Sequence, residues 1–167
     1  VVSDGSADIW FGTYSMGISE FEGMSWTTHR TGDGLAHNQA YAVAIDGADH
    51  AWFATHGGVS KFDGESWTTY TTHDGLGSNS VTAAAFDGDG NLWVGTYYGG
   101  VSVYDGETWS TYREPDGLAD NTVFAVAADA DGDKWFGTRS GGVSKFDGVN
   151  WTTYTTTHGL GANWVNA

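Results

Sequence analysis

The chain has 167 residues, of which 21 are acidic and 6 basic, and its formal net charge is −15. A field of that sign repels phosphate backbones and anionic lipid headgroups, so nucleic acid and membrane surfaces are poor partners. The lack of cysteine excludes disulfides and thiolate metal sites, and no apolar run approaches the ~18 residues that a membrane-spanning helix needs. We expect no signal peptide either, because no charged segment precedes a hydrophobic stretch.

Short sequence motifs, called marks below, recur along the whole chain at a nearly constant spacing. The tetrads WFGT, WFAT, WVGT and WFGT begin 42, 41 and 42 residues apart, at Trp10, Trp52, Trp93 and Trp135. A second mark ends at Trp26, Trp67, Trp109 and Trp151, and a third, DGLxxN or HGLxxN, ends at Asn38, Asn79, Asn121 and Asn163. Several marks that coincide at fixed spacing in four copies establish an internal repeat.

Each copy divides into four short strands separated by turns. In the third copy we predict strands at 81–87, 92–96, 101–105 and 108–112, because Asp-Gly and Gly-Gly pairs between them supply the positive φ of tight hairpins. A repeat of about 40 to 45 residues with four strands predicts an all-β propeller with four blades per chain, each of four antiparallel strands. The Trp of each tetrad is expected to fill the space between blades, and Gly12, Gly95 and Gly137 to leave room for the neighbouring blade.

The two ends of the chain fall within one strand of the repeat. Aligned on its own copies, Ala167 takes the position of Ala83, and Val1 takes that of Ala84. We therefore expect residues 163–167 and 1–4 to be two halves of one innermost strand, so that the ring seam lies inside it. Three outcomes stay open: a closed four-bladed monomer, two chains that form an eight-bladed ring, or a segment of a longer array. An unclosed array exposes strand edges that invite pairing, which favours self-association into a homo-oligomer.

The third copy, NSVTAAAFDGDGNLWVGTYYGGVSVYDGETWSTYREPDGLADN, resembles the two-component regulator propeller repeat. The matching marks are a strand that ends in Asp, then GNLWVGT, GGVSVYD and the closing DGL with Asn, and the resemblance extends over the whole chain. It implies a bacterial β-propeller. Members of this family usually form sensory domains outside the membrane in signalling proteins, and many are associated with glycans.

The loops between the second and third strands carry variable residues within a constant frame. In propellers, ligands generally bind at the face that holds these loops and the links between blades. Aromatic rings with nearby amide and hydroxyl groups suit sugars, which offer apolar C–H faces and hydroxyl edges. We therefore predict a ligand site formed by residues of the loops, links and following strands: Tyr14, His37, Tyr41, His56, Tyr97, Tyr98, Asp120, Arg139 and Trp164. The alternative is that these are ordinary solvent-exposed loop residues. Phe124 stands at the start of a strand, as Tyr41 does.

Other polar residues of the repeat have structural explanations. The four link Asn residues, together with Asp33, Asp74 and Asp116, are expected to hydrogen-bond local backbone and fix the turn. The loop that contains Asp87, Asp89 and Asn91 resembles the opening of a calcium loop, but position twelve holds Tyr98 in place of the bidentate Glu, and a hairpin turn is the preferred explanation. We expect no resident cofactor, with calcium at these three residues as the alternative.

Taken together, the sequence favours a non-catalytic ligand-binding or sensing propeller, extracellular or periplasmic, for a neutral glycan or a similar small ligand. Two alternatives stay open. The whole number of repeats is compatible with a structural, self-assembling propeller module. A propeller lyase is the other, since a lyase that inactivates streptogramin antibiotics has similar repeats; it requires a His and acid cluster on one face.

Overall fold

A computed structural model describes residues 1–3, 5 and 8–167, and nearly all of its regular structure is β-sheet. It contains four antiparallel sheets of four strands each, one per repeat, which confirms the predicted propeller architecture. Blade 1 consists of β1 (Val2–Ser3), β2 (Ile9–Gly12), β3 (Ile18–Glu22) and β4 (Ser25–His29); blade 2 consists of β5 (Ala40–Ile45), β6 (Ala51–Thr55), β7 (Gly58–Phe62) and β8 (Trp67–Tyr70). Blade 3 consists of β9 (Val81–Phe86), β10 (Leu92–Thr96), β11 (Val101–Tyr104) and β12 (Trp109–Tyr112); blade 4 consists of β13 (Val123–Ala128), β14 (Lys134–Thr138), β15 (Val143–Phe146) and β16 (Trp151–Tyr154).

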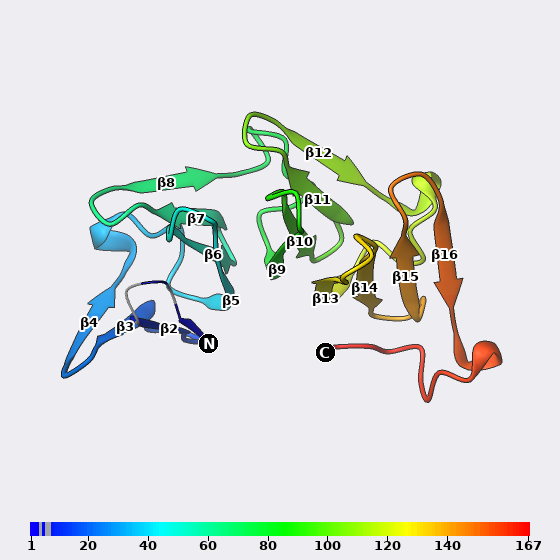
Figure 1. The fold of residues 1–167 in the computed structure, drawn as a ribbon, viewed down its shortest axis with the longest axis horizontal. Helices are drawn as coiled ribbons and strands as arrows, with labels where there is room; N and C mark the ends of the chain where they lie inside the picture. The colour runs from blue at the N-terminus through cyan, green and yellow to red at the C-terminus, as the bar shows by residue number, and fades with distance from the viewer. Residues whose placement is uncertain (4, 6–7) are drawn as a thin grey trace.

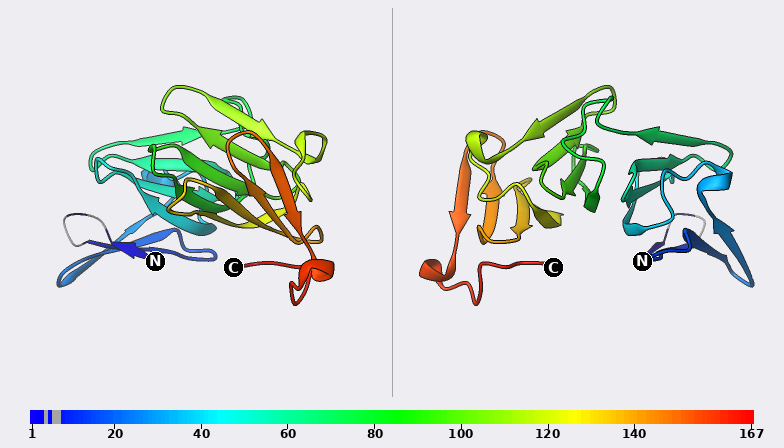
Figure 2. Two further views of the ribbon diagram at one scale, coloured as in Figure 1. Left: turned by 45° about the vertical axis from the view of Figure 1, so that its right-hand side comes forward. Right: turned by 180° about the vertical axis from the view of Figure 1, so that it is seen from behind.

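The blades follow one another around an open arc (Figure 1). Strand β9 contacts β5 and β13 at the inner side of the arc, and β4, β8, β12 and β16 lie at its outer side. Both termini lie at the open side, and blades 1 and 4 form the two ends of the arc in every view (Figures 1 and 2). The inner strands therefore frame a common centre, as they do around the central channel of a propeller.

The predicted strands in blade 3 were each correct to within one residue. The structure ends β9 at Phe86 and β11 at Tyr104, and it begins β12 at Trp109. The residues that drop out of the strands are bound in turns. Asp105, for example, accepts hydrogen bonds from the backbone N–H of Glu107 at 2.9 Å and of Thr108 at 2.7 Å. A side chain that satisfies turn amides in this way ends the ladder.

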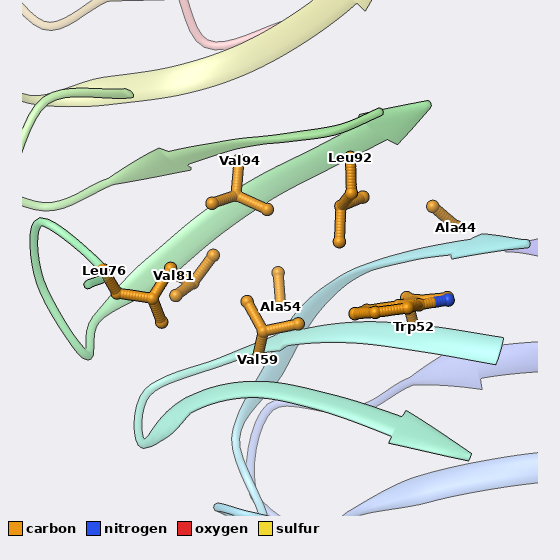
Figure 3. Close-up of a cluster of buried hydrophobic side chains, with 8 residues drawn as sticks. All are labelled: Ala44, Trp52, Ala54, Val59, Leu76, Val81, Leu92 and Val94. Carbon is orange, nitrogen blue, oxygen red and sulfur yellow. The ribbon is translucent and has the colours of Figure 1, made fainter. Parts of the chain in front are cut away.

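The hydrophobic core is divided into three clusters, one at each interface between neighbouring blades. Figure 3 shows the cluster in which Trp52, Ala54 and Val59 of blade 2 face residues of blade 3. The tetrad Trp lies in the interface in each case: Trp10, Trp52 and Trp93 are 3%, 3% and 5% exposed. Each fully buried large apolar side chain contributes about 1.5–3 kcal/mol, so these interfaces carry most of the stability.

The tetrad glycines allow the blades to approach each other, as the sequence predicts. A Cβ on Gly95 would stand 2.8 Å from Cγ1 of Val123 in the next blade. A Cβ on Gly12 would meet the Ala40 carbonyl oxygen at 3.0 Å. Both positions face the innermost strand of the following blade, where an added methyl group has no room.

The links between blades are fixed by side-chain hydrogen bonds to local backbone. The Oδ1 atoms of the four link Asn residues accept backbone N–H bonds at 2.7 to 3.0 Å, from Thr31, Thr72, Glu114 and Thr156 to Asn38, Asn79, Asn121 and Asn163. The carboxylates of Asp33, Asp74 and Asp116 likewise accept bonds from the backbone N–H of residues three positions earlier. Short 3-10 helices occupy three of the links, at Thr31–Asp33 (η1), Glu114–Asp116 (η2) and Thr156–His158 (η3). The predicted structural role of these Asn and Asp residues is confirmed.

Residues 163–167 lie along blade 4 in the place of a further innermost strand. The backbone N–H of Gly142 donates to the Asn163 carbonyl at 3.0 Å, as that of Gly17 donates to the Asn38 carbonyl at 2.8 Å between blades 1 and 2. The Val165 N–H donates to the Thr138 carbonyl at 2.9 Å. At the other end, β1 is the innermost strand of blade 1, and Asp4 of the predicted half-strand lies outside the described residues. Residues 163–167 and β1 thus occupy innermost-strand positions at the two ends of the arc, and that they are two halves of one strand stays a prediction.

Candidate functional site

A hollow of about 360 Å³ opens at the end of the inner strands that faces the variable loops. We call its four aromatic residues, Tyr41, Tyr97, Phe124 and Trp164, the aromatic mouth. Its polar lining consists of Ser80, Thr82 and Asn166. Three of the residues predicted from sequence, Tyr41, Tyr97 and Trp164, therefore line one hollow.

β-bulges turn the side chains of the inner strands toward this hollow. The register between β13 and β14 pairs Val123 with Thr138 and then Ala125 with Gly137, so that Phe124 has no partner in the ladder. Tyr41 in β5 and Thr82 in β9 stand at the same bulge position of their own blades. A bulge inserts an unpaired residue and re-aims its side chain, which explains why one repeat position supplies a lining residue from each of blades 2, 3 and 4.

The aromatic rings lie close enough to form one apolar wall. The Phe124 and Trp164 rings are 6.4 Å apart and inclined by 24°, and the Tyr97 and Phe124 rings are 6.0 Å apart. Trp164 is 64% exposed and Tyr41 43% exposed, so both rings have a free face. Burial raises the pKa of Tyr41, and the nearby Tyr14 raises it further, so Tyr41 is a neutral hydrogen-bonding group at pH 7.

One side of the mouth carries the predicted residues Tyr98, Arg139 and Asp120. Arg139 Nη1 donates to the Tyr98 hydroxyl at 3.2 Å, and the Tyr97 and Tyr98 rings are 4.4 Å apart. Hydrogen bonds from Tyr97 and Arg139 lower the pKa of Tyr98, and the bond to Tyr98 raises the pKa of Arg139. Asp120 accepts bonds from the backbone N–H and the hydroxyl of Ser140. These contacts order the loop beside the mouth.

The other side carries the two predicted histidines. His56 Nδ1 lies 3.0 Å from the Ser80 hydroxyl, and the rings of His37 and His56 are 5.4 Å apart. His37 is held by its own link, since its Nδ1 accepts the Gln39 backbone N–H at 3.0 Å. Tyr14, in blade 1, is 76% exposed and lies outside the hollow. The structure thus places eight predicted residues in or beside the mouth and leaves Tyr14 at its edge.

Four lining residues were not in the predicted set: Ser80, Thr82, Phe124 and Asn166. These four residues can be identified in the sequence by their positions relative to the link Asn of each repeat. Trp164 and Ser80 directly follow the link Asn, and Tyr41, Thr82, Phe124 and Asn166 stand three residues after it. Aligning the copies on that Asn therefore identifies the lining of the site, whereas aromatic character alone finds only part of it.

The loop at Asp87 is closed by its own hydrogen bonds. Asp87 Oδ1 accepts the backbone N–H groups of Asp89 and Asn91 at 3.0 and 2.9 Å, and Oδ2 accepts the indole N–H of Trp93 at 2.8 Å. Within residues 1–3, 5 and 8–167, no group of three or more His, Cys, Asp or Glu side chains is placed to hold a metal ion. The hairpin turn is observed, and calcium binding at this loop stays a prediction.

Comparison with known proteins connects this architecture to signalling domains. The chain is similar to the extracellular domain of a hybrid two component system from B. thetaiotaomicron, with 25% identity and a TM-score of 0.81 over 96% of this chain and 23% of that one. A second such domain from the same organism has 22% identity and a TM-score of 0.81, over 96% of this chain and 25% of that one. The chain thus spans about a quarter of the length of these two structures.

A virginiamycin B lyase from Staphylococcus aureus shares the fold at 12% identity, with a TM-score of 0.75 over 92% of this chain and 53% of that one. No curated protein matches the sequence. In the part of the chain that the structure describes, no helix is long and apolar enough to cross a membrane. Residues 75–98 match the family model described as two component regulator propeller. The other three copies carry the same motifs at the same spacing as the matched residues.

Proposed function

We propose that this chain is a non-catalytic ligand-binding propeller whose aromatic mouth holds a neutral glycan or a similar small ligand. The observation that carries the proposal is the composition of one hollow of about 360 Å³: four aromatic side chains with hydroxyl and amide groups between them. Ligand sites are concave and mostly apolar, with a few placed polar groups that fix orientation. Aromatic faces pack against sugar C–H groups, while hydroxyl and amide groups exchange hydrogen bonds with sugar hydroxyls.

The charge of the chain favours a neutral ligand over an anionic one. The net charge of −15 repels anions at long range, and Arg139, the cation beside the mouth, already donates to Tyr98. The lining itself contains no charged side chain. A neutral sugar meets neither this repulsion nor the cost of burying an unpaired charge.

The comparisons support a location outside the cytoplasm. The two B. thetaiotaomicron structures are extracellular domains of two component systems, and we infer that this chain likewise works in an extracellular or periplasmic setting as a sensing or binding module. Protease digestion of intact cells that express the parent polypeptide tests the location. Cleavage within the propeller without lysis is expected, and full protection of the propeller until lysis would contradict it.

Titration with a panel of neutral oligosaccharides tests the binding proposal, with indole fluorescence and calorimetry as readouts. Trp164 is 64% exposed and stacks on Phe124, so its fluorescence should respond directly when the mouth fills. Trp164→Ala should weaken binding about tenfold, the equivalent of ~1.4 kcal/mol, whereas Trp164→Phe should retain most of the affinity because it keeps an aromatic face.

Val149→Ala provides the control, since Val149 is 82% exposed in the turn before β16 and lies outside the hollow. It should bind as the unmodified chain does. A panel that gives no binding and no ligand-induced shift in melting temperature would argue against a glycan ligand. Equal binding by the Trp164→Ala variant and the unmodified chain would argue against this site.

A further inference from the structure

A second pocket lies between blades 1 and 2, at the end of the blades opposite to the aromatic mouth. It has a volume of about 240 Å³ and is lined in part by the turns that follow β5 and β7. We call it the acidic pocket and define it by four carboxylates and two aromatic rings: Asp8, Glu20, Asp49, Asp63, Trp10 and Phe62. Its lining contains no Lys or Arg among the residues that the structure describes. Both walls belong to neighbouring blades of this chain, so the pocket is part of an internal interface.

The other three tetrad Trp residues show what this position of the fold accommodates. In blades 2, 3 and 4 a lysine Nζ lies 5.1, 5.5 and 5.3 Å from the centroid of the Trp ring: Lys61 on Trp52, Lys134 on Trp93 and Lys145 on Trp135. The same three ammonium groups pair with carboxylates, those of Asp46 at 3.9 Å, Asp87 at 3.5 Å and Asp133. Each of these rings thus contacts an ammonium group that a carboxylate also holds, and the two interactions are both favourable.

The first two blades have other residues at the positions that supply these lysines. The residue opposite the tetrad Trp in the ladder is Lys61 in blade 2 and Lys145 in blade 4, but Glu20 in blade 1. Lys134 extends from blade 4 to the Trp ring of blade 3, and its repeat position in blade 2 is Ala51, which lines the acidic pocket. Between blades 1 and 2, one lysine position therefore holds a carboxylate and the other a methyl group.

Two histidines lie at or beside the acidic pocket, and each pairs with a carboxylate. His29 Nε2 lies 2.8 Å from Glu20 Oε2, and His50 Nδ1 lies 2.9 Å from Asp46 Oδ2. Glu20 is 8% exposed, and burial raises its pKa, an effect that the hydrogen bond to His29 only partly offsets. A further positive charge in the pocket would favour the ionised form of Glu20.

We propose that the acidic pocket binds the primary ammonium group of a ligand, in the place that a lysine of the chain itself occupies at the other three tetrad Trp residues. The ammonium group contacts the Trp10 and Phe62 rings, whose centroids are 6.0 Å apart, and pairs with Glu20. The volume of about 240 Å³ is below the ~300–1,000 Å³ of sites for drug-sized ligands, so the ligand is a small alkylamine or a lysine side chain. The net charge of −15 attracts such a cation, and the site is independent of the aromatic mouth.

The arrangement of the carboxylates favours an organic cation over a metal ion. Calcium takes about six to eight oxygen ligands at short range, and in the described part of the chain no three acidic or histidine side chains converge to hold a metal. Asp49 Oδ1 accepts the Gly5 N–H at 3.0 Å. Backbone hydrogen bonds from Ser66 and Glu65 lower the pKa of Asp63 to about 2. These bonds hold both carboxylates at their own backbone partners, where they contribute negative charge around the pocket.

Titration of the isotope-labelled chain with n-butylammonium, followed by two-dimensional NMR at constant ionic strength, tests the proposal. The backbone amides of Ala51, Phe62 and Gly64 belong to lining residues, and they should shift saturably with a dissociation constant of about 1 mM. The neutral analogue n-butanol and calcium chloride should not reproduce these shifts. Nα-acetyl-lysine methylamide identifies the source of the ligand: equal or tighter binding indicates a lysine side chain, and binding of n-butylammonium alone indicates a small amine.

Three variants locate the site. Glu20→Lys supplies the ammonium group that Lys61 and Lys145 supply in their own blades, and it should raise the dissociation constant about 100-fold. Glu20→Gln removes the charge while keeping the size of the side chain, and it should raise the dissociation constant about tenfold. Glu107→Lys is the control, because it makes the same change of net charge as Glu20→Lys at an exposed turn residue of blade 3. It should bind as the unmodified chain does.

Three results overturn the proposal. The first is the lack of saturable shifts at the pocket amides at tens of millimolar n-butylammonium. The second is binding that Glu20→Lys and Glu20→Gln leave unchanged. The third is an equal response to calcium or to n-butanol, which would show that the pocket does not recognise an ammonium group. The dispersion of the NMR spectrum shows whether each variant is folded, and Glu20→Gln decides the test if Glu20→Lys does not fold.

Discussion

The hydrogen bond from the tetrad Trp to the Asp that ends the inner strand gives the most quantitative prediction. Asp87 is 8% exposed, and it accepts the Trp93 indole N–H at 2.8 Å together with two turn amides. Asp87→Ala leaves the indole N–H without an acceptor in a buried position, which costs about 1–3 kcal/mol, and the loss of the turn bonds adds roughly 1 kcal/mol. We expect a total of about 3 kcal/mol, equivalent to a fall of about 6–12 °C in melting temperature for a chain of this length.

Asp105 offers the matched control, because it also accepts two turn amides but lies in an exposed hairpin without an indole partner. Asp105→Ala should cost about 1 kcal/mol, so the difference of about 2 kcal/mol reports the buried indole bond together with the ion pair between Asp87 and Lys134, whose atoms lie 3.5 Å apart. Urea unfolding followed by circular dichroism measures the free energy of unfolding of both variants. The dependence of this free energy on urea concentration should be the same in both, because a repeat protein that unfolds in parts would show a smaller slope. Equal losses in the two variants would refute the assignment of the difference to Trp93.

The same carboxylate gives the chain part of its acid sensitivity. Burial tends to raise the pKa of Asp87, but hydrogen bonds from Trp93 and Asn91 and the charge of Lys134 outweigh it, so the pKa lies below the ordinary 3.8. A depressed carboxyl pKa means that the folded state binds fewer protons than the unfolded state. The stabilisation is therefore complete above about pH 4 and is lost as the pH falls through the folded pKa.

Three further substitutions follow from contacts described above. Gly95→Val pushes a side chain into Val123, whose Cγ1 stands 2.8 Å from the site of the new Cβ, and it should cost about 2–3 kcal/mol in urea unfolding; a neutral result would contradict the close approach of the blades. Glu20→Gln keeps a hydrogen-bonding side chain beside His29, whose Nε2 lies 2.8 Å from Glu20 Oε2 in the unmodified chain. Because burial raises the pKa of Glu20 above 4.5, the unmodified chain loses stability as the pH rises from that value, and the variant should lack this loss when unfolding is measured between pH 4 and 7. His158→Asp introduces the residue that the other three links have at this position, and it should stabilise the chain by about 0.5–1 kcal/mol; a lower melting temperature would show that the ring of His158 is needed.

The fold could be predicted from the sequence because several independent sequence features recur at the same spacing in all four copies. The tetrad glycines, the link Asn residues and the tetrad Trp residues each have one physical role, and that role is visible from spacing alone. Strand ends were displaced by one residue where Asp105 or Thr108 enters a turn, because hydrogen bonds of side chains to turn amides are not part of the hydrophobic pattern.

The candidate site was less predictable. Aromatic character identified Tyr41, Tyr97 and Trp164, but Thr82 and Asn166 have no distinctive chemistry. In β5, β9 and β13 a bulge brings this repeat position to the hollow. Bulges arise from ladder register, which short inner strands such as Val81–Phe86 do not reveal in sequence. The open arc could not be predicted from the repeat pattern either. The number of repeats gives the number of blades, but the angle between neighbouring blades determines whether four of them close a ring.

The main-chain bond made by the residue after each tetrad Thr has a consequence for how such chains diversify. The anchoring at His56, Tyr97 and Arg139 uses only their backbone N–H groups, so the frame is indifferent to the side chain attached. Blades 2, 3 and 4 thus each carry one residue of the proposed ligand site together with its own anchor. Duplicating, deleting or exchanging a blade transfers that residue to the mouth already in place, so new ligand preferences can arise by rearranging whole blades without redesigning the core.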